Sequence, residues 1–175
     1  MKNILIAFCL FVPFAAFTQL DTSKPALPMK NGKVCYEKTY TVATTLTKNA
    51  VYSKALQWLK TAFPAYSSSV ITNKTAGTIA GTGIFKVAVN ANGNYYWLRP
   101  VIGITVVDGS YTIQLVNFYE KPIEKGITND YSKIEYRWRD FNRGRPWSQE
   151  DYPLFRGLDA NAQSIMASLE KAVNE

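Results

Sequence analysis

Residues 95–120, YYWLRPVIGITVVDGSYTIQLVNFYE, decide the fold of this chain. Two runs rich in β-branched and aromatic residues, 95–107 and 110–120, flank Asp108-Gly109, and the glycine of this pair tolerates the positive φ of a tight turn. The stretch therefore predicts two long antiparallel strands joined by a hairpin turn.

Upstream of this hairpin, residues 69–94 have the pattern of further strands separated by turns. The polar residues 73–76 and the asparagine-rich residues 90–94 interrupt the apolar pattern, because asparagine and glycine favour turns. One face of the predicted strands is apolar and carries Ile79, Phe85, Val87 and Val89. Together with the hairpin, these strands predict an antiparallel meander.

Gly77, Gly81 and Gly83 could suggest a phosphate-binding loop, but no Gly-Lys-Ser/Thr follows and no helix begins there. Glycines within a strand more often allow another part of the backbone to approach closely, or they mark a bulge. We therefore expect a helix to cross the sheet near these residues.

Two flanking patterns complete the first half of the chain. Residues 33–42 alternate between apolar and polar side chains, which predicts a strand. Residues 48–63 carry apolar side chains at helical spacing, with Thr47 as a candidate cap and Pro64 ending the run. The second half predicts another helix, capped by Asp159, and an irregular segment before it in which residues 133–139 form a short strand.

The order of elements predicts an α+β domain with an antiparallel sheet of about five or six strands and two helices on one face. We expect a single domain, since the chain has 175 residues. The predicted parts are an export signal (1–19), an extended arm (20–31), the core (32–121), an arginine- and aromatic-rich irregular segment (122–157) and the C-terminal helix (158–175).

The first residues favour export from the cytoplasm. Lys2 precedes the apolar run 4–12, and Ala16-Phe17-Thr18 places small residues before a cut at Gln19. The run is too short to span a bilayer, and no later segment is more apolar. We therefore expect the mature chain to have no transmembrane segment and to reside in the periplasm, at the cell envelope or outside the cell.

The charge balance favours acidic partners. The chain has 20 basic and 13 acidic side chains, and removal of Lys2 leaves 19 against 13, a net charge of +6. Such a charge favours an anionic glycolipid, an anionic polysaccharide or an acidic envelope protein. It is equally consistent with a protein whose charge only maintains solubility.

The chain contains no histidine. Histidine is the base of serine and cysteine triads and the commonest zinc ligand, so those hydrolases and histidine-ligated metal sites are excluded. No cluster has calcium or zinc spacing, and we expect no catalytic residue, metal or cofactor. The close carboxylate pairs Glu120/Glu124 and Glu150/Asp151 keep a carboxylate-based hydrolase open as a third hypothesis.

The predicted strand 133–139 and the loop after it carry the strongest binding signal. On such a strand Ile134, Tyr136 and Trp138 would be buried, and the basic side chains between them would face water. Arginine beside aromatic rings suits phosphate, sulfate or carboxylate groups. The predicted contact residues are Arg137, Arg139, Arg143, Arg145 and Trp147.

Two other interpretations of this surface remain open. The same arginines could be solvated side chains paired with nearby carboxylates. Nucleic acid would also suit arginines and rings, but export argues against it. A second functional hypothesis is a carrier of a small apolar ligand, with a cavity between the sheet and the last helix lined by Phe85, Trp97 and Leu115.

Three stretches carry a resemblance to a known family: NGKVCYE at 31–37, the helix containing Trp58, and GTIAGTGIF at 77–85. Over Gly32 to Tyr119 the chain resembles the bacterial domain-of-unknown-function family 4468. This resemblance implies a curved sheet of the TATA-binding-protein (TBP)-like type with the order β-α-β4-α. It implies no activity and no catalytic residues, and a shared fold does not transfer DNA binding.

Overall fold

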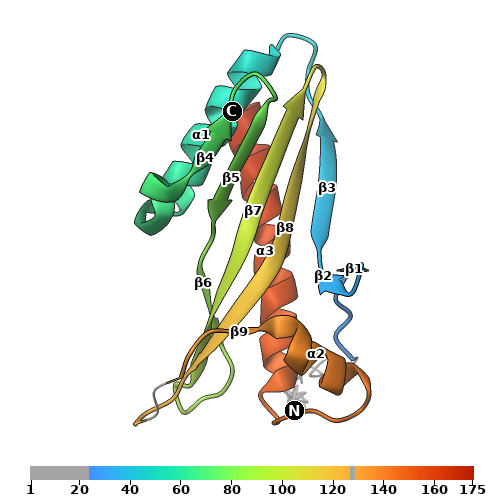
Figure 1. The fold of residues 1–175 in the computed structure, drawn as a ribbon, viewed down its shortest axis with the longest axis vertical. Helices are drawn as coiled ribbons and strands as arrows, with labels where there is room; N and C mark the ends of the chain where they lie inside the picture. The colour runs from blue at the N-terminus through green and yellow to red at the C-terminus, as the bar shows by residue number, and fades with distance from the viewer. Residues whose placement is uncertain (1–23, 127–128) are drawn as a thin grey trace, which may run out of the picture.

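The hairpin predicted over residues 95–120 lies at the centre of the fold (Figure 1). The computed structural model describes residues 24–126 and 129–175. Strands β7 (Tyr95–Val107) and β8 (Ser110–Ile123) pair antiparallel along their length, and Gly109 in the turn between them has a φ of 77°. The sequence prediction of this hairpin is confirmed.

The remaining strands extend this hairpin on both sides. The path through the seven-stranded sheet is β3-β8-β7-β5-β4, while β6 pairs with β7 below β5 and β9 pairs with the lower end of β8. A separate two-stranded ribbon is formed by β1 and β2. Their bounds are β1 Met29–Lys30, β2 Lys33–Val34, β3 Tyr36–Thr41, β4 Ile71–Asn73, β5 Thr78–Thr82, β6 Phe85–Ala88 and β9 Ser132–Lys133.

Helices α1 (Lys48–Ala62) and α3 (Asp151–Asn174) cover one face of the sheet; in Figure 1, α3 runs behind β7 and β8, and α1 lies at the upper left. The predicted cap of α1 is confirmed, because Thr47 Oγ1 accepts a hydrogen bond of 3.2 Å from the Ala50 amide. A short 3-10 helix, Pro64–Ser69, follows α1. The third helix, α2 (Ile134–Asn142), lies at the lower end, beside β8 and β2.

The predicted fold class, an α+β domain with helices on an antiparallel sheet, is confirmed. The sheet has seven strands instead of five or six, because the two-residue β9 joins it and the extended segment before β7 divides into β5 and β6. The division falls at Gly83, where an added Cβ would lie 2.8 Å from Ile102 Cδ1.

The glycine-rich strand also lies where we expected a helix to cross. A Cβ on Gly81 would lie 2.9 Å from Leu59 Cδ2 of α1, so α1 approaches the sheet where the side chain is missing. Leu59 is buried, together with the inward faces of β5 to β8. The crossing predicted from Gly81 is therefore confirmed.

The strand predicted at residues 133–139 is wrong, because Ile134–Asn142 form α2. Ile134, Trp138 and Phe141 are buried, and their spacing of four and three residues places them on one helical face. Alternation over so few residues fits either period. The consequence is that Tyr136, expected in the core, is 51% exposed.

The last helix begins at Asp151, eight residues before the predicted cap Asp159. Pro153 is compatible with this start because the first turn needs no amide donor from it. Asp159 instead accepts a hydrogen bond of 3.0 Å from the Tyr36 hydroxyl, which links α3 to β3. Gly157, the last residue of the predicted irregular segment, lies inside α3, and glycine suits this position because a Cβ there would overlap Val87 of β6.

The predicted export signal, residues 1–19, lies outside the described residues. The described part of the predicted arm is not free of the core: Leu27 is buried, and the Pro28 carbonyl accepts a hydrogen bond of 3.0 Å from the Cys35 amide. Residues 29–30 then form β1. The arm is thus attached to the sheet through the β1–β2 ribbon.

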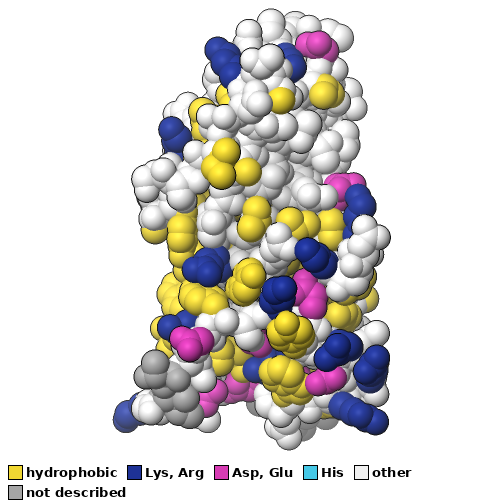
Figure 2. Space-filling model, in the orientation of Figure 1, with side chains coloured by type: hydrophobic (Ala, Val, Ile, Leu, Met, Phe, Trp, Pro, Cys, Tyr) yellow, Lys and Arg dark blue, Asp and Glu magenta, His cyan; other side chains and the backbone are white. Residues whose placement is uncertain are grey.

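The face of the sheet opposite α1 and α3, here called the open face, has two different halves, and Figure 2 shows this face. Near the β7–β8 turn, a threonine row crosses four strands, formed by Thr78, Thr105, Thr112 and Thr39. Towards the other end, two aromatic–basic rows take its place, Lys86–Trp97–Lys121 and Arg99–Tyr119–Lys133. In Figure 2 hydrophobic and basic side chains are interleaved over this lower half.

Candidate binding surface

Arg137, predicted to face water, is buried and paired with two carboxylates. Its Nε lies 3.0 Å from Glu120 Oε1 of β8, and its Nη1 lies 2.8 Å from Asp151 Oδ1 at the start of α3. The prediction failed because α2 is a helix, on which position 137 turns toward β8 and α3. Arg137 therefore fastens three elements together instead of contacting solvent.

Aromatic rings and a loop complete this buried network. The guanidinium carbon of Arg137 lies 5.0 Å from the Tyr96 ring centroid and 4.9 Å from that of Trp147. Asp151 Oδ2 accepts a hydrogen bond of 2.7 Å from the Trp147 amide. Burial by itself lowers the pKa of Arg137, but the nearby Glu120 and Asp151 carboxylates outweigh it and raise that pKa. The network thereby fixes the loop that carries Trp147.

Glu120 is a buried member of the network. Burial raises its pKa, and the pairing with Arg137 opposes that shift without reversing it. Its Oε1 also accepts a hydrogen bond of 3.3 Å from the Ser132 hydroxyl, while Oε2 is buried and has no hydrogen-bond partner among the described residues. Removal of Arg137 would leave this carboxylate without its counter-charge.

The other predicted contact residues are exposed at the end of α2. Gly144, with a φ of 77°, folds the chain back, and the Arg145 amide donates a hydrogen bond of 2.9 Å to the Asp140 carbonyl. Cations also suit this position because a helix C-terminus is electronegative. All four side chains of this short segment, Arg139, Arg143, Arg145 and Trp147, are exposed, and the segment is called here the arginine surface.

Within residues 24–126 and 129–175, no carboxylate lies within 4.0 Å of the side-chain nitrogens of Arg139, Arg143 or Arg145. Trp147 is 51% exposed, and its indole Nε1 donates a hydrogen bond of 2.8 Å to Asp140 Oδ2. The nearby acid is therefore engaged by tryptophan and leaves the three guanidinium groups available.

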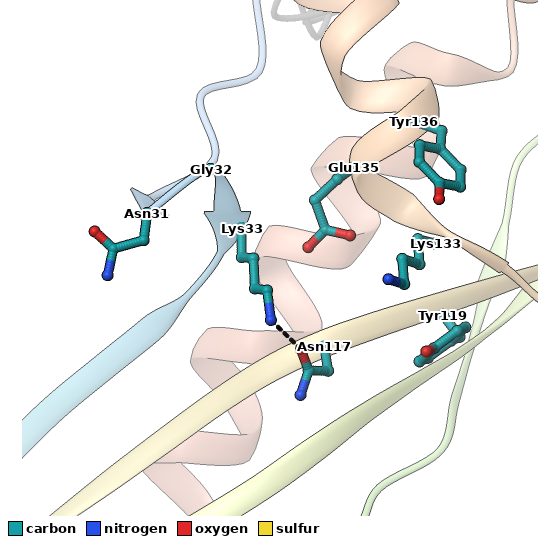
Figure 3. Close-up of a pocket in the computed structure, with 8 residues that line it drawn as sticks. All are labelled: Asn31, Gly32, Lys33, Asn117, Tyr119, Lys133, Glu135 and Tyr136. Carbon is teal, nitrogen blue, oxygen red and sulfur yellow. Dashed lines mark hydrogen bonds between the residues drawn. The ribbon is translucent and has the colours of Figure 1, made fainter.

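A pocket that we did not predict lies between the β1–β2 turn, β8 and α2 (Figure 3). It has a volume of about 250 Å³ and is called here the β8–α2 pocket. It is lined by Asn31, Gly32, Lys33, Asn117, Tyr119, Lys133, Glu135 and Tyr136. Figure 3 shows the side chains of Lys33, Glu135 and Lys133 pointing into the same space, above Asn117 and Tyr119.

A β-bulge in the central hairpin shapes the floor of this pocket. The pairing of β7 and β8 shifts between Arg99 and Val101, so Asn117 and Phe118 both lie opposite Pro100. Proline has no amide to donate to the ladder, and sheets accommodate it at such bulges. Because of the extra residue, Asn117 and Tyr119 belong to the open face although Leu115 faces the core.

The opposite wall is the tight turn of the β1–β2 ribbon. Asn31 has a φ of 52° and Gly32 a φ of 74°, as a two-residue hairpin turn requires. Glu135 Oε1 accepts a hydrogen bond of 3.1 Å from the Val34 amide and so joins α2 to this ribbon. In the sequence, Pro100 could have indicated the bulge of this site, and the Asn31-Gly32 pair its tight turn. Neither signal identifies a pocket, because the pocket forms only where the tertiary fold brings these segments together.

The rings of the open face continue from the pocket along the sheet. The Arg99 guanidinium carbon lies 4.2 Å from the Tyr131 ring centroid and 5.9 Å from that of Tyr119. Further along β7, the rings of Tyr95 and Trp97 contact edge to face, with centroids 5.7 Å apart. Tyr119, which lines the pocket, therefore also belongs to a longer aromatic surface.

The residues proposed to line a lipid cavity do not share a face. Phe85 and Leu115 are buried under the helices, whereas Trp97 lies on the open face. The predicted carboxylate pair Glu150/Asp151 is also divided: Asp151 binds Arg137, and Glu150 accepts hydrogen bonds from Asn94 and Tyr96. Neither arrangement supports the carrier or the hydrolase hypothesis.

The described residues contain neither a metal-binding cluster nor a membrane-spanning helix. No group of three histidine, cysteine, aspartate or glutamate side chains in this part of the chain could hold a metal ion. Among the same residues, no helix is both long and apolar enough to cross a bilayer.

Comparison with known proteins places this geometry in a family. Residues 36–121 match the model of DUF4468, a domain of unknown function with a TBP-like fold. A TBP-like protein from Parabacteroides distasonis superposes with a TM-score of 0.69 at 19% identity, covering 84% of this chain and 96% of that one. A DUF4468 family protein from Bacteroides ovatus gives a TM-score of 0.69 at 16% identity, covering 85% and 91%. No curated protein matches the sequence.

Proposed function

Residues 36–121 of this chain belong to the DUF4468 family, which has a TBP-like fold and no assigned function, and from the surface of this chain we propose that the protein has a binding role. The protein is a non-catalytic binding module of the bacterial cell envelope that holds an anionic glycolipid or polysaccharide. Its contact residues are Arg139, Arg143, Arg145 and Trp147. The export signal predicted at residues 1–19 supports the location.

The observation that carries this proposal is the contrast among arginines of one segment. Arg137 is buried with two carboxylates and holds α2 in place. The next three arginines are exposed at the end of that helix, and no carboxylate of the described residues lies within 4.0 Å of their side-chain nitrogens. A rigid support that presents unpaired guanidinium groups beside an indole ring suits phosphate, sulfate or carboxylate groups on a partner.

The test measures binding of the mature protein, residues 20–175, to immobilised dextran sulfate and to phosphatidylglycerol vesicles at low and physiological salt. The variant Arg143→Ala/Arg145→Ala should bind at least about fivefold more weakly, and the difference should shrink as salt screens the charges. The matched control, Lys60→Ala/Lys74→Ala, removes the same charge from exposed positions elsewhere and should change binding less than about twofold.

The two probes distinguish the sources of the anion, because the polymer presents sulfates on a sugar chain and the vesicle presents phosphates on a membrane. Equal binding by the arginine variant and the control would show that only net charge matters. That result would remove the arginine surface from the proposal.

A further inference from the structure

We infer that the β8–α2 pocket binds one carboxylated sugar unit of an acidic saccharide, and that the adjacent aromatic–basic rows contact the neighbouring units. This inference deepens the proposed function and rests on it, since it names the chemical class of the anionic partner. It uses different residues from the arginine surface, so the two can be tested separately.

The pocket combines the groups that sugar recognition requires. The rings of Tyr119 and Tyr136 are available at its floor and rim, and Tyr136 is 51% exposed. Aromatic rings present a flat apolar surface that packs on the C–H face of a sugar ring. Asn117 and Glu135 supply an amide and a carboxylate, which donate to and accept from sugar hydroxyls.

The charges in the pocket select an acidic sugar with a single negative charge. Lys33 and Lys133 both line the space and are exposed, so their ammonium groups can pair with a carboxylate. Glu135 opposes them and leaves a side-chain net charge of +1. A monoanionic carboxylate neutralises that charge, whereas a phosphate dianion would leave one negative charge beside Glu135 without a counter-charge in the pocket.

Neighbouring side chains partly organise the pocket before any ligand binds. Lys33 Nζ donates a hydrogen bond of 3.3 Å to Asn117 Oδ1, and the Val34 amide holds one oxygen of Glu135. Among the described residues, the two non-glycine positions with positive φ are Asn31 and Asn117, and both line this pocket. Such backbone conformations gather where a site must be shaped.

The open face beyond the pocket offers contacts for further units. The row Arg99–Tyr119–Lys133 ends in two residues of the pocket, and the parallel row Lys86–Trp97–Lys121 lies one step further along β7. Lys86 Nζ lies 3.9 Å from the Tyr95 ring centroid, so bases and rings alternate here as well. An extended chain of acidic sugars matches both the repeat of rings and the repeat of charges.

The experiment measures, by isothermal titration, the affinity of the mature protein for trigalacturonic acid, a hyaluronan tetrasaccharide and sialyllactose. Maltotriose serves as the neutral control and inorganic phosphate as the dianion control. We expect at least one acidic saccharide to bind about tenfold or more tightly than maltotriose, and phosphate to compete poorly. The variants Lys33→Gln, Lys133→Gln and Tyr136→Ala should each weaken that binding about fivefold to tenfold.

Exposed positions were chosen so that the variants fold, and circular dichroism verifies this. Lys60→Gln on α1 is the matched loss of one charge and should leave the affinity unchanged. Loss of binding in the pocket variants but not in Arg143→Ala/Arg145→Ala supports the pocket.

Two outcomes overturn the inference while the proposed function stands: no acidic saccharide binds although dextran sulfate does, or binding is lost only in the arginine variant. Equal binding of maltotriose would overturn the selection of an acidic sugar. If neither dextran sulfate, vesicles nor saccharides bind, both proposals fail.

Discussion

The two halves of the open face share strands β7 and β8, but their side chains find partners in different ways. In the upper half, threonines face one another across the ladder, and Thr39 Oγ1 lies 2.8 Å from Thr112 Oγ1. In the lower half, rings face basic side chains, as in Trp97 opposite Lys86 and Lys121. Threonine hydroxyls can satisfy one another, whereas an exposed ring beside a lysine keeps both available to a partner.

The support beneath the two halves differs as well. Apolar residues of α1 and α3 pack under the upper half, but the lower end also depends on the charged network of Glu120, Arg137 and Asp151. The surface proposed to bind a partner is thus held by apolar packing together with one buried charged network. The comparison teaches that the half of the sheet proposed to bind a partner should also be the half most sensitive to the loss of a single charged residue.

Removal of the buried arginine should have the largest effect on this contrast. Arg137→Ala leaves Glu120 and Asp151 buried without their counter-charge, so we expect the free energy of unfolding to fall by about 3–5 kcal/mol. Urea denaturation followed by circular dichroism measures the change. Arg139→Ala, an exposed change two residues away, should cost less than about 0.5 kcal/mol. Similar stability of both variants would show that the buried network contributes no more to the free energy of unfolding than an exposed arginine does.

Replacing glycine by alanine should change stability in opposite directions on the helix-covered face and on the open face of the sheet. In Gly157→Ala the new Cβ would overlap Val87 of β6, and we expect a loss of about 1–3 kcal/mol even though alanine favours a helix. Gly103→Ala is the control, because nothing lies within 4 Å of a Cβ there, and it should be neutral or stabilising by up to about 1 kcal/mol. Thermal or urea unfolding distinguishes the signs, and a stabilising Gly157→Ala would contradict the packing described.

The pair Thr39 and Thr112 of the upper half should have a smaller effect on stability. A double-mutant cycle with Thr39→Val and Thr112→Val retains the β-branched shape and removes the hydroxyls. We expect a coupling free energy of about 0.2–1 kcal/mol from unfolding measurements, in favour of the native pair. Independent, additive effects of the two changes would mean that the upper row is not internally satisfied.

The pKa values of two glutamates should shift in opposite directions from their ordinary value. The hydrogen bond from Lys30, assisted by Gln114, lowers the pKa of Glu37 below 4.5, and burial raises the pKa of Glu120 above 4.5. Carboxyl carbon NMR shifts measured against pH test both directions directly. The order would be contradicted if Glu37 titrated above Glu120.

The same shifts predict opposite contributions to stability. The contribution of Glu37 is present above its unfolded pKa and is lost as pH falls through the lowered folded pKa. The contribution of Glu120 is present below its unfolded pKa and is lost as pH rises through the raised folded pKa. The stability of wild type relative to Glu120→Gln should therefore decrease as pH rises from about 4.5.

Regular patterns predicted the fold, because long elements repeat their signal many times. The hairpin of β7 and β8, the capped helix α1 and the apolar stripe of α3 all follow from periodicity. The failure at residues 133–139 has the opposite cause, since in a run of seven residues both periods place apolar residues acceptably. That local ambiguity decided whether Arg137 would be exposed or buried.

The candidate surfaces could be predicted only in part. Arg139, Arg143 and Arg145 were recognisable as a basic cluster because they are close in the sequence. The β8–α2 pocket was not, since Lys33, Asn117 and Glu135 come from three segments that only the tertiary fold brings together. The structure also assigns Asp151 to Arg137, a pairing that no local pattern indicated.

The bulge opposite Pro100 has a consequence for how the hairpin assembles. Above it odd-numbered residues of β8 face the core, and below it even-numbered residues such as Phe118 do so. A slip of β8 by one residue would expose Phe118 and bury Asn117, so misaligned pairings are penalised on both sides of the bulge. The proline and its bulge therefore fix the register of β7 and β8, the longest strand pair among the described residues.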